Sequence, residues 1–279
     1  MEARERTLHD IAEEIATIVV KRHDMGMDYG TVLVPEGIVE FVPEFSALIA
    51  EINELLAGGK TEEFNALPDW AAKYDYIKKG LSAEAFGVFD ILPQFVQQQL
   101  FLERDPHGNV QVSLIESEKL FSEMVKNELK KRKEAGTFKG KFGTQHHFFG
   151  YEGRCAFPSN FDADYCYSLG YNAFMLIQYG YTGYLSKVSN ISRPAEEWVA
   201  GGMPITKMMN MERRNGEDKP VIRKALVELD GAPFKYFEAH REEWAVKTSF
   251  LYPGAIQYFG PAEVCDLTTR TLALEKGQN

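Results

Sequence analysis

The chain has 279 residues, of which 44% are hydrophobic and 26% are charged, and this balance is typical of a globular protein and excludes disordered and fibrous classes. Its net charge is −10, with 41 acidic against 31 basic residues, which argues against a nucleic-acid partner because such binding needs a concentrated positive field. At this length the chain can bury a sizeable core without disulfides or structural metal.

The cysteines indicate a protein with reduced thiols, and the lengths of the apolar runs indicate a water-soluble one. The three cysteines, Cys155, Cys166 and Cys265, are odd in number and show no C-x-x-C spacing, which favours free thiols. The chain has no run of about 18 apolar residues, and its charged N-terminus lacks the apolar stretch of a signal peptide. We therefore expect a cytoplasmic protein with no membrane contact.

The first predicted elements are a helix and a strand. Apolar residues from Leu8 to Val19 repeat at helical spacing, with Thr7 as a candidate N-cap and Gly26 as a candidate stop. The apolar run 31–34 follows and ends at Pro35-Glu36-Gly37. A helix followed by such a strand predicts an α/β fold with a parallel sheet buried on both faces.

The middle of the chain has a different character. From about Pro43 to Gly136, helix-forming residues dominate, with helical periodicity at 45–56, 92–102 and 116–133. A turn at 105–109 lies between two of these segments, and one short strand is expected at 110–114. We interpret this region as a helical insertion.

The α/β pattern returns after residue 137. Strands are expected at 143–149 and 183–188, and a helix at 160–179 that ends at Gly180. Weaker helical patterns cover 219–229 and 263–274. The sequence therefore divides into a first α/β segment at 1–42, the helical insertion at 43–136 and a second α/β segment at 137–279, which we expect to pack as one unit.

Several motifs fail on physical grounds. Gly58-Gly59-Lys60-Thr61 resembles the end of a P-loop, but Glu54 stands where that loop needs glycine, and a helix precedes it where a strand is required. His146 and His147 are adjacent, so on a strand they face opposite sides and cannot bind one metal together. The basic run 130–133 ends a predicted helix, where it complements the helix dipole.

Glu36 is the first candidate site residue. It follows the predicted strand 31–34 at the carboxyl end, where α/β proteins bind their ligands, and Pro35 and Gly37 fix a turn around it. A carboxylate there can accept hydrogen bonds from sugar hydroxyls. The alternative from position alone is an ordinary exposed turn carboxylate.

The second candidate is the segment Gly150-Tyr151-Glu152-Gly153-Arg154, which again follows a predicted strand and precedes a helix. The guanidinium of Arg154 matches phosphate oxygens bidentately, and the hydroxyl of Tyr151 adds a neutral donor three residues away. The two glycines let the backbone approach a ligand closely. The alternative is a surface turn whose arginine pairs with a nearby carboxylate.

The two candidate sites belong to a set of segments that resemble a known family. The chain is similar to the long-chain class of pyrophosphate-dependent phosphofructokinase, in chain order and from about Leu8 to the C-terminus. The segments that carry the resemblance are 32–37, 150–154, 157–162 (Phe-Pro-Ser-Asn-Phe-Asp), 201–206 (Gly-Gly-Met-Pro-Ile-Thr) and 211–214 (Met-Glu-Arg-Arg).

The resemblance implies a phosphofructokinase-like parallel-sheet α/β fold with a helical insertion. It implies phosphorylation of the 1-hydroxyl of fructose 6-phosphate from pyrophosphate, reversibly and with Mg²⁺. It implies that Glu36 contacts the sugar and that Tyr151 and Arg154 bind the sugar phosphate. Gln145 departs from the family pattern, since relatives often have an arginine there that reaches across a subunit interface.

Three motifs of the family have no counterpart in this chain. A Gly-Gly-Asp loop, a Thr-Ile-Asp-x-Asp motif and a Met-Gly-Lys or Met-Gly-Arg motif would supply the anion cradle, the Mg²⁺ ligands and the base of phosphoryl transfer. In the family all three lie upstream of the matched region. We therefore expect no catalytic and no metal-ligating residues here, with Mg²⁺ and pyrophosphate held by the other half of the enzyme.

Three functions stay open on the sequence alone. The first is the fructose-6-phosphate-binding C-terminal portion of the enzyme, inactive by itself and part of a homo-oligomer when complete. The second is a non-catalytic regulatory or sugar-phosphate-binding subunit. The third is an α/β domain whose Tyr151–Arg154 loop is only structural.

Overall fold

The structure is a computed structural model, and it groups the chain into two compact units. One unit is Met1–His147 with Glu212–Lys219, and the other is Phe148–Met211 with Pro220–Asn279. The residues that the structure describes are 6–35, 37–57, 59–102, 104, 110–151, 158–214, 217–222, 226–248 and 270–277.

Helix α1 (Leu8–Asp24) opens the first unit and confirms the predicted helix and both of its ends. The Thr7 hydroxyl accepts a hydrogen bond from the Asp10 amide at 3.1 Å, and the Asp10 carboxylate accepts one from the Thr7 amide at 2.9 Å. This reciprocal pair is a capping box. Gly26 has φ +79°, a left-handed conformation that ends the helix at little steric cost.

Short helices fill the segment that the sequence predicted to be helical. They are η2 (Ile38–Phe41), α2 (Pro43–Leu55), α3 (Lys60–Asn65), α4 (Trp70–Gly80), α5 (Ala83–Ile91), α6 (Gln94–Gln99), η3 (Val112–Leu114) and α7 (Ser117–Glu134). The short strand expected at 110–114 is wrong, because Val110 forms only an isolated bridge to Arg104 and the residues after it form a 3₁₀ turn.

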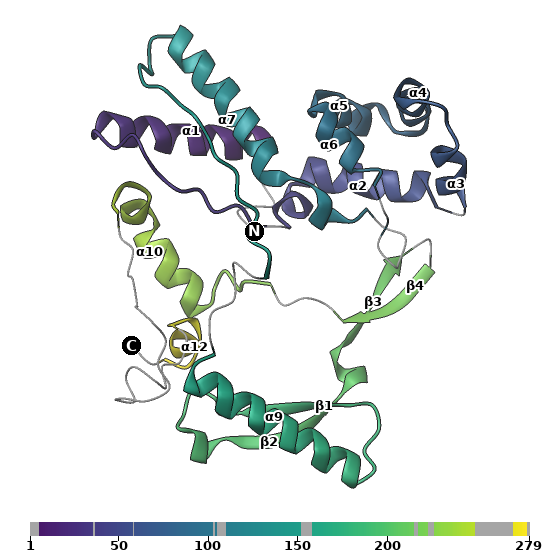
Figure 1. Cartoon of the computed structure of the whole chain (residues 1–279), viewed down its shortest axis with the longest axis vertical. Coiled ribbons are helices and arrows are strands. Elements are labelled where there is room, and N and C mark those ends of the chain that lie inside the picture. Colours follow the sequence, from purple (N-terminus) through teal and green to yellow (C-terminus); the bar gives the residue numbers. More distant parts are fainter. Residues whose placement is uncertain are drawn as a thin grey trace. The chain divides into compact units, whose positions relative to one another are not determined.

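The core of the first unit lies among these helices. Phe45, Leu48 and Ile52 repeat at helical spacing on one face of α2, and all three are fully buried. They belong to one hydrophobic cluster with Phe64 and Phe89. A second, smaller cluster joins α1 to α7, which cross at an angle in Figure 1, and it contains Ala12, Ala16, Val125, Leu129 and Phe138.

Two predicted strands do not form in the described residues. Residues 31–34 and 143–149 have no regular secondary structure, and Leu33 and Val32 are 81% and 55% exposed. A strand exists only when a neighbouring strand pairs with its backbone, and no described segment supplies that partner. The two predictions are therefore wrong for the chain as the structure describes it.

The second unit is built on a helix and a hairpin. Helix α9 (Asn160–Gln178) lies across the hairpin of β1 (Tyr184–Ser189) and β2 (Val199–Pro204), as Figure 1 shows. The strands pair antiparallel in a register that runs from Tyr184 opposite Pro204 to Ser189 opposite Val199. The predicted helix and its stop at Gly180, which has φ +74°, are confirmed, and so is the strand predicted at 183–188.

The remaining elements complete the described part of the chain. They are η4 (Ala195–Glu197), η5 (Ile205–Met208), β3 (Met209–Arg214), β4 (Glu217–Ile222), α10 (Ala232–Val246) and α12 (Arg270–Glu275). The helix expected at 219–229 is wrong at its start, where β4 pairs with β3. The C-terminal helix expected at 263–274 corresponds to α12, which begins at Arg270. Residues 263–269 of that prediction lie outside the described residues.

The structure thus mixes helices and strands, as the sequence predicted. The sheets of the described residues are the pairs β1–β2 and β3–β4, and the register of β1–β2 is antiparallel. The parallel sheet expected from the strand at 31–34 is not formed by these elements. The physical reason is that both segments predicted as its strands lack a pairing partner here.

Candidate functional site

Of the three predicted substrate ligands, the structure describes Tyr151. Its side chain is 71% exposed, and Phe148 and Phe149 before it are also exposed. Glu36 and Arg154 lie outside the described residues. The structure therefore does not test whether the three side chains meet at one ligand.

The residues that flank position 36 form a turn, as Pro35 and Gly37 predict. The Ile38 amide donates to the Pro35 carbonyl at 3.1 Å, and η2 begins directly after Gly37. A hydrogen bond from residue i+3 back to residue i is typical of a tight turn.

The segment that leads to Tyr151 is fixed to α7 by side chains. The hydroxyls of Thr144 and Ser122 lie 2.7 Å apart, and Thr144 also lies 3.3 Å from the Nε2 atom of His146. Gln145, His146 and His147 are all exposed. Because residues 143–149 form no strand, the expectation that the two histidines face opposite sides of a sheet is also wrong.

A hydrogen-bonded carboxylate lies at the start of α7. Glu116 accepts a hydrogen bond from the Gln99 side-chain amide at 2.8 Å and pairs with Lys119. The pKa of Glu116 is lowered from its ordinary value, first by the hydrogen bond from Lys119 and then by that from Gln99, with a smaller contribution from the charge of His146. Glu116 is therefore held ionised, and it acts as a structural acceptor that fixes the first turn of the helix.

The end of the Tyr151–Arg154 loop is set by a second capping box. The Ser159 hydroxyl accepts from the Asp162 amide at 3.3 Å, and the Asp162 carboxylate accepts from the Ser159 amide at 2.9 Å. The segment Ser-Asn-Phe-Asp therefore begins α9 at Asn160. The S-x-x-D spacing in the sequence is a signal for the start of a helix. It gives Ser159 and Asp162 of the segment 157–162 a structural role as helix-capping residues.

The segment 201–206 has a packing role that the sequence analysis missed. A Cβ atom at Gly202 in β2 would lie 2.9 Å from the Tyr184 side chain of β1 and 3.0 Å from the Leu176 side chain of α9, so a larger residue there would force these side chains to move. The Gly201 carbonyl accepts a hydrogen bond from the side-chain amide of Asn172 at 2.7 Å. This part of the motif therefore joins α9 to the hairpin.

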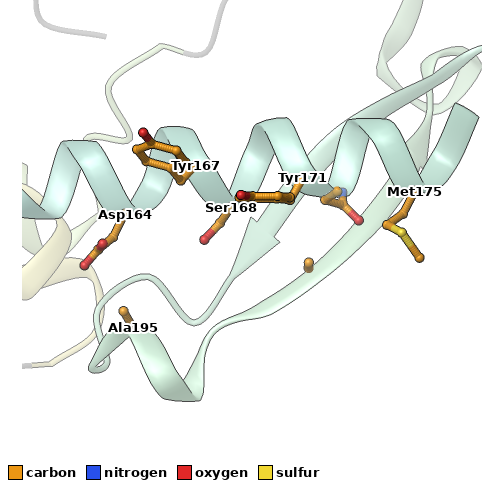
Figure 2. A pocket seen from close by; sticks show the side chains of 8 residues that line it. Asp164, Tyr167, Ser168, Tyr171, Met175 and Ala195 are labelled. Carbon is orange, nitrogen blue, oxygen red and sulfur yellow. The ribbon is translucent and has the colours of Figure 1, made fainter.

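A shallow pocket of about 460 Å³ lies between α9 and the segment that carries Ala195 and Ala200. In Figure 2 the side chains of Asp164 and Ser168 extend from the helix toward Ala195, while Tyr167 and Tyr171 lie farther from it. Tyr151, the predicted substrate ligand that the structure describes, is not among the residues that line this pocket. Among the described residues, no three or more His, Cys, Asp or Glu side chains gather in a way that could hold a metal ion.

Comparison with curated proteins finds relatives along nearly the whole chain. A pyrophosphate–fructose 6-phosphate 1-phosphotransferase of Entamoeba histolytica is 52% identical over 276 residues, which is 99% of this chain. The chain is a homologue of these phosphotransferases. A subunit beta 1 of the enzyme from Arabidopsis thaliana is 50% identical over 275 residues, and a subunit alpha 2 from the same plant is 35% identical over 266 residues.

The chain spans about half the length of the phosphotransferases that it matches. It covers 50% of the Entamoeba protein and 46% of the plant beta subunit. No protein-family model matches the sequence. Within the part that the structure describes, no helix combines the length and the apolar character needed to cross a membrane.

Proposed function

We propose that the chain is the fructose-6-phosphate-binding, C-terminal portion of a pyrophosphate-dependent 6-phosphofructokinase. The observation that carries the proposal is the 52% identity to a pyrophosphate–fructose 6-phosphate 1-phosphotransferase across 99% of this chain. The reaction moves a phosphoryl group from pyrophosphate to the 1-hydroxyl of fructose 6-phosphate. A new P–O bond forms, the bridging P–O bond breaks, and the products are fructose 1,6-bisphosphate, phosphate and the hydroxyl proton.

In the proposed enzyme, this chain binds and orients the acceptor sugar. Arg154 supplies a bidentate cation to the 6-phosphate, Tyr151 adds a hydroxyl donor and Glu36 accepts from the sugar hydroxyls. Holding the 1-hydroxyl in line with the donor removes much of the entropic barrier to transfer. No step of the transfer is assigned to residues of this chain.

The other half would hold pyrophosphate and Mg²⁺, in a phosphofructokinase-like fold in which residues 43–136 are a helical insertion between α/β segments. Mg²⁺ would neutralise charge on the transferred phosphoryl group. The family motifs for these tasks are absent from this sequence. The plant relatives are named as subunits, which supports an oligomeric complete enzyme, and we propose a homo-oligomer.

The alternative of a non-catalytic sugar-phosphate-binding subunit has less support. The relatives that match nearly the whole chain at 50% identity or more carry the name of the phosphotransferase itself.

The test uses a chimera in which the half of the Entamoeba protein that this chain does not match is joined before Met1. We expect Arg154→Ala to raise the KM for fructose 6-phosphate by roughly 10- to 100-fold, because a charge-assisted hydrogen bond contributes about 1.5–3 kcal/mol. Steady-state kinetics with pyrophosphate in excess measure the effect.

The matched control for this variant is Arg193→Ala. Arg193 is an exposed arginine that pairs with Glu197 at 2.9 Å and lies in none of the segments that resemble the family. Its removal should leave the KM unchanged. An unchanged KM in Arg154→Ala as well would show that Arg154 is not a phosphate ligand.

A further inference from the structure

The chain from Phe138 to His146, which we call the return segment, runs back along α7 toward the start of that helix. Gly136 has φ +75° and reverses the chain after the helix, and the Thr137 amide donates to the Arg132 carbonyl at 2.9 Å. In Figure 1 the coil that follows α7 turns back toward the beginning of the helix. The return segment forms no helix or strand, so side-chain contacts are needed to fix its position.

One side of the return segment lies on α7. The residues at even positions from 138 to 144 are buried or partly buried, as expected for an extended chain whose side chains alternate between two sides. Phe138 belongs to the small hydrophobic cluster with Val125 and Leu129 of α7, and Phe142 packs against the same cluster. Apolar contacts therefore hold the first part of the return segment.

Thr144 attaches the end of the return segment to the same face of α7. Its hydroxyl lies 2.7 Å from that of Ser122, which is only 7% exposed. Ser122 comes before Val125 and Leu129 at helical spacing, so the three side chains share one face. The Thr144 hydroxyl also lies 3.3 Å from the Nε2 atom of His146. A buried polar contact thus ends a row of apolar ones.

This polar contact lies close in sequence to the predicted phosphate ligands. Tyr151 follows Thr144 by seven residues, so even a fully extended chain keeps its Cα atom within about 25 Å of that of Thr144. A loop that begins at a fixed point has fewer conformations to lose when it orders around a ligand. Such preorganisation lowers the free-energy cost of binding.

We propose that Thr144, held by Ser122, is a positioning residue for the sugar phosphate, because it fixes the point from which the Tyr151–Arg154 loop begins. Neither hydroxyl is assigned a contact with the substrate. The proposal rests on the proposed function, since it needs the loop to bind the 6-phosphate. The alternative is that the hydroxyl pair only stabilises the fold of the first unit.

Thr144→Val tests this role because valine keeps the shape of threonine and removes its hydroxyl. In the chimera described above, we expect the KM for fructose 6-phosphate to rise by about three- to tenfold, which is the size of one hydrogen bond between neutral groups. The kcat should stay unchanged, as expected for a change that weakens binding of the substrate and of the transition state equally. Thr144→Ser keeps the hydroxyl and should restore the original KM.

Thr137→Val is the matched control at the other end of the same connection. The Thr137 hydroxyl donates to the Arg132 carbonyl of α7 at 3.0 Å, so this variant also removes a hydroxyl contact with the helix. Thr137 lies fourteen residues before Tyr151, and we expect its replacement to lower the Tm without changing the KM. Equal KM values in the two valine variants would show that the Thr144 hydroxyl is only structural.

Ser122→Ala removes the other hydroxyl of the pair from a different element. If the two hydroxyls act as a unit, Ser122→Ala should raise the KM by a similar factor, and the double variant with Thr144→Val should raise it no further. Effects that multiply in the double variant would contradict a shared role.

Arg154→Ala in the same chimera separates this proposal from the proposed function. If Arg154→Ala raises the KM and Thr144→Val does not, the positioning role is refuted and the proposed function stands. If neither variant changes the KM, the phosphate-binding role of the loop fails and the positioning role fails with it. If Thr144→Val alone raises the KM, the positioning role is supported and Arg154 is not a phosphate ligand.

Calorimetric titration of the 279-residue chain with fructose 6-phosphate makes the same comparison without turnover. The Kd should rise by about three- to tenfold in Thr144→Val and stay unchanged in Thr137→Val. An unchanged Kd in a folded Thr144→Val chain would overturn the proposal.

Discussion

At the scale of single residues, a buried polar side chain adds a hydrogen bond to a helix C-terminus. The Leu92 amide donates to the Phe89 carbonyl at 3.2 Å, and Pro93 has no N–H to add a second bond. The buried side-chain amide of Gln97 donates to the same carbonyl at 3.0 Å. This hydrogen bond explains why a polar residue lies on the buried side of α6.

Gln97→Glu tests this role because it removes the donor without changing the shape of the side chain. An ionised carboxylate would face the carbonyls of Phe89 and Asp90, so we expect a loss of about 1–3 kcal/mol of stability at neutral pH. Burial raises the pKa of such a carboxyl group, so the loss should shrink as the pH falls and the group becomes protonated. Urea unfolding at two pH values measures both effects.

The control for Gln97→Glu is Gln98→Glu. Gln98 is the next residue and is exposed, so its replacement should change stability by no more than about 0.5 kcal/mol. Equal effects at the two positions would contradict the role given to Gln97.

The capping box of α1 makes a prediction about pH. The pKa of Asp10 is lowered from its ordinary value of 3.8, first by the hydrogen bond from the Thr7 amide and then by the interaction with the Thr7 side chain. The stabilising effect is therefore fully present above pH 3.8 and is lost as the pH falls through the lower, folded-state pKa. Titration of the Asp10 carboxyl by NMR checks the direction, and a pKa at or above the ordinary value would contradict it.

At the scale of elements, α9 and the hairpin are joined by very few polar contacts. Asn172 is central because its amide group reaches β1 through Ser186 and β2 through Gly201. Gly202 then permits the close approach of Tyr184 and Leu176. The segment 201–206 is thus explained in part by packing, with no ligand required.

Asn172→Asp replaces both donors by a carboxylate oxygen that faces the Gly201 carbonyl. We expect the hairpin to separate from α9 more often, and amide hydrogen exchange in β1 and β2 should be at least about tenfold faster. Ser168→Ala provides the control, because it is a change on the same helix at a residue that lines the pocket. Unchanged exchange in Asn172→Asp would show that ring packing with Trp198 is sufficient.

At the scale of the whole molecule, the two units differ in how they are stabilised. The helices of the first unit enclose their own core, with Phe45, Phe64 and Phe89 fully buried. The described elements of the second unit enclose none. This difference leads to the expectation that the second unit contributes less to the stability of the chain than the first.

We predict that the 279-residue chain alone shows no pyrophosphate-dependent turnover of fructose 6-phosphate. The residues for donor binding and phosphoryl transfer are expected in the other half, so acceptor binding alone cannot accelerate the reaction. A coupled assay for fructose 1,6-bisphosphate measures turnover, with the chimera as the positive control. Turnover by the purified chain at a rate near that of the chimera would refute the half-enzyme proposal.

Sequence reasoning succeeded at the ends of two helices. Thr7 and Gly26 define the ends of α1, and Gly180 ends α9, because capping and left-handed φ angles depend on a few adjacent residues. The roles of Glu36, Tyr151 and Arg154 rest on equally local patterns, and they stay predictions. The homologues agree with the family that those segments resemble.

The sequence alone determined helix α1, the helical character of residues 43–136, helix α9 and strand β1, but it did not predict α10. The chemistry expected of the Tyr151–Arg154 loop stays a prediction. The tertiary structure decided which strand-like segments form strands, because strand formation depends on pairing with a distant part of the chain. Residues 31–34 and 143–149 have strand-like sequences but form no strand, since no described segment pairs with their backbone.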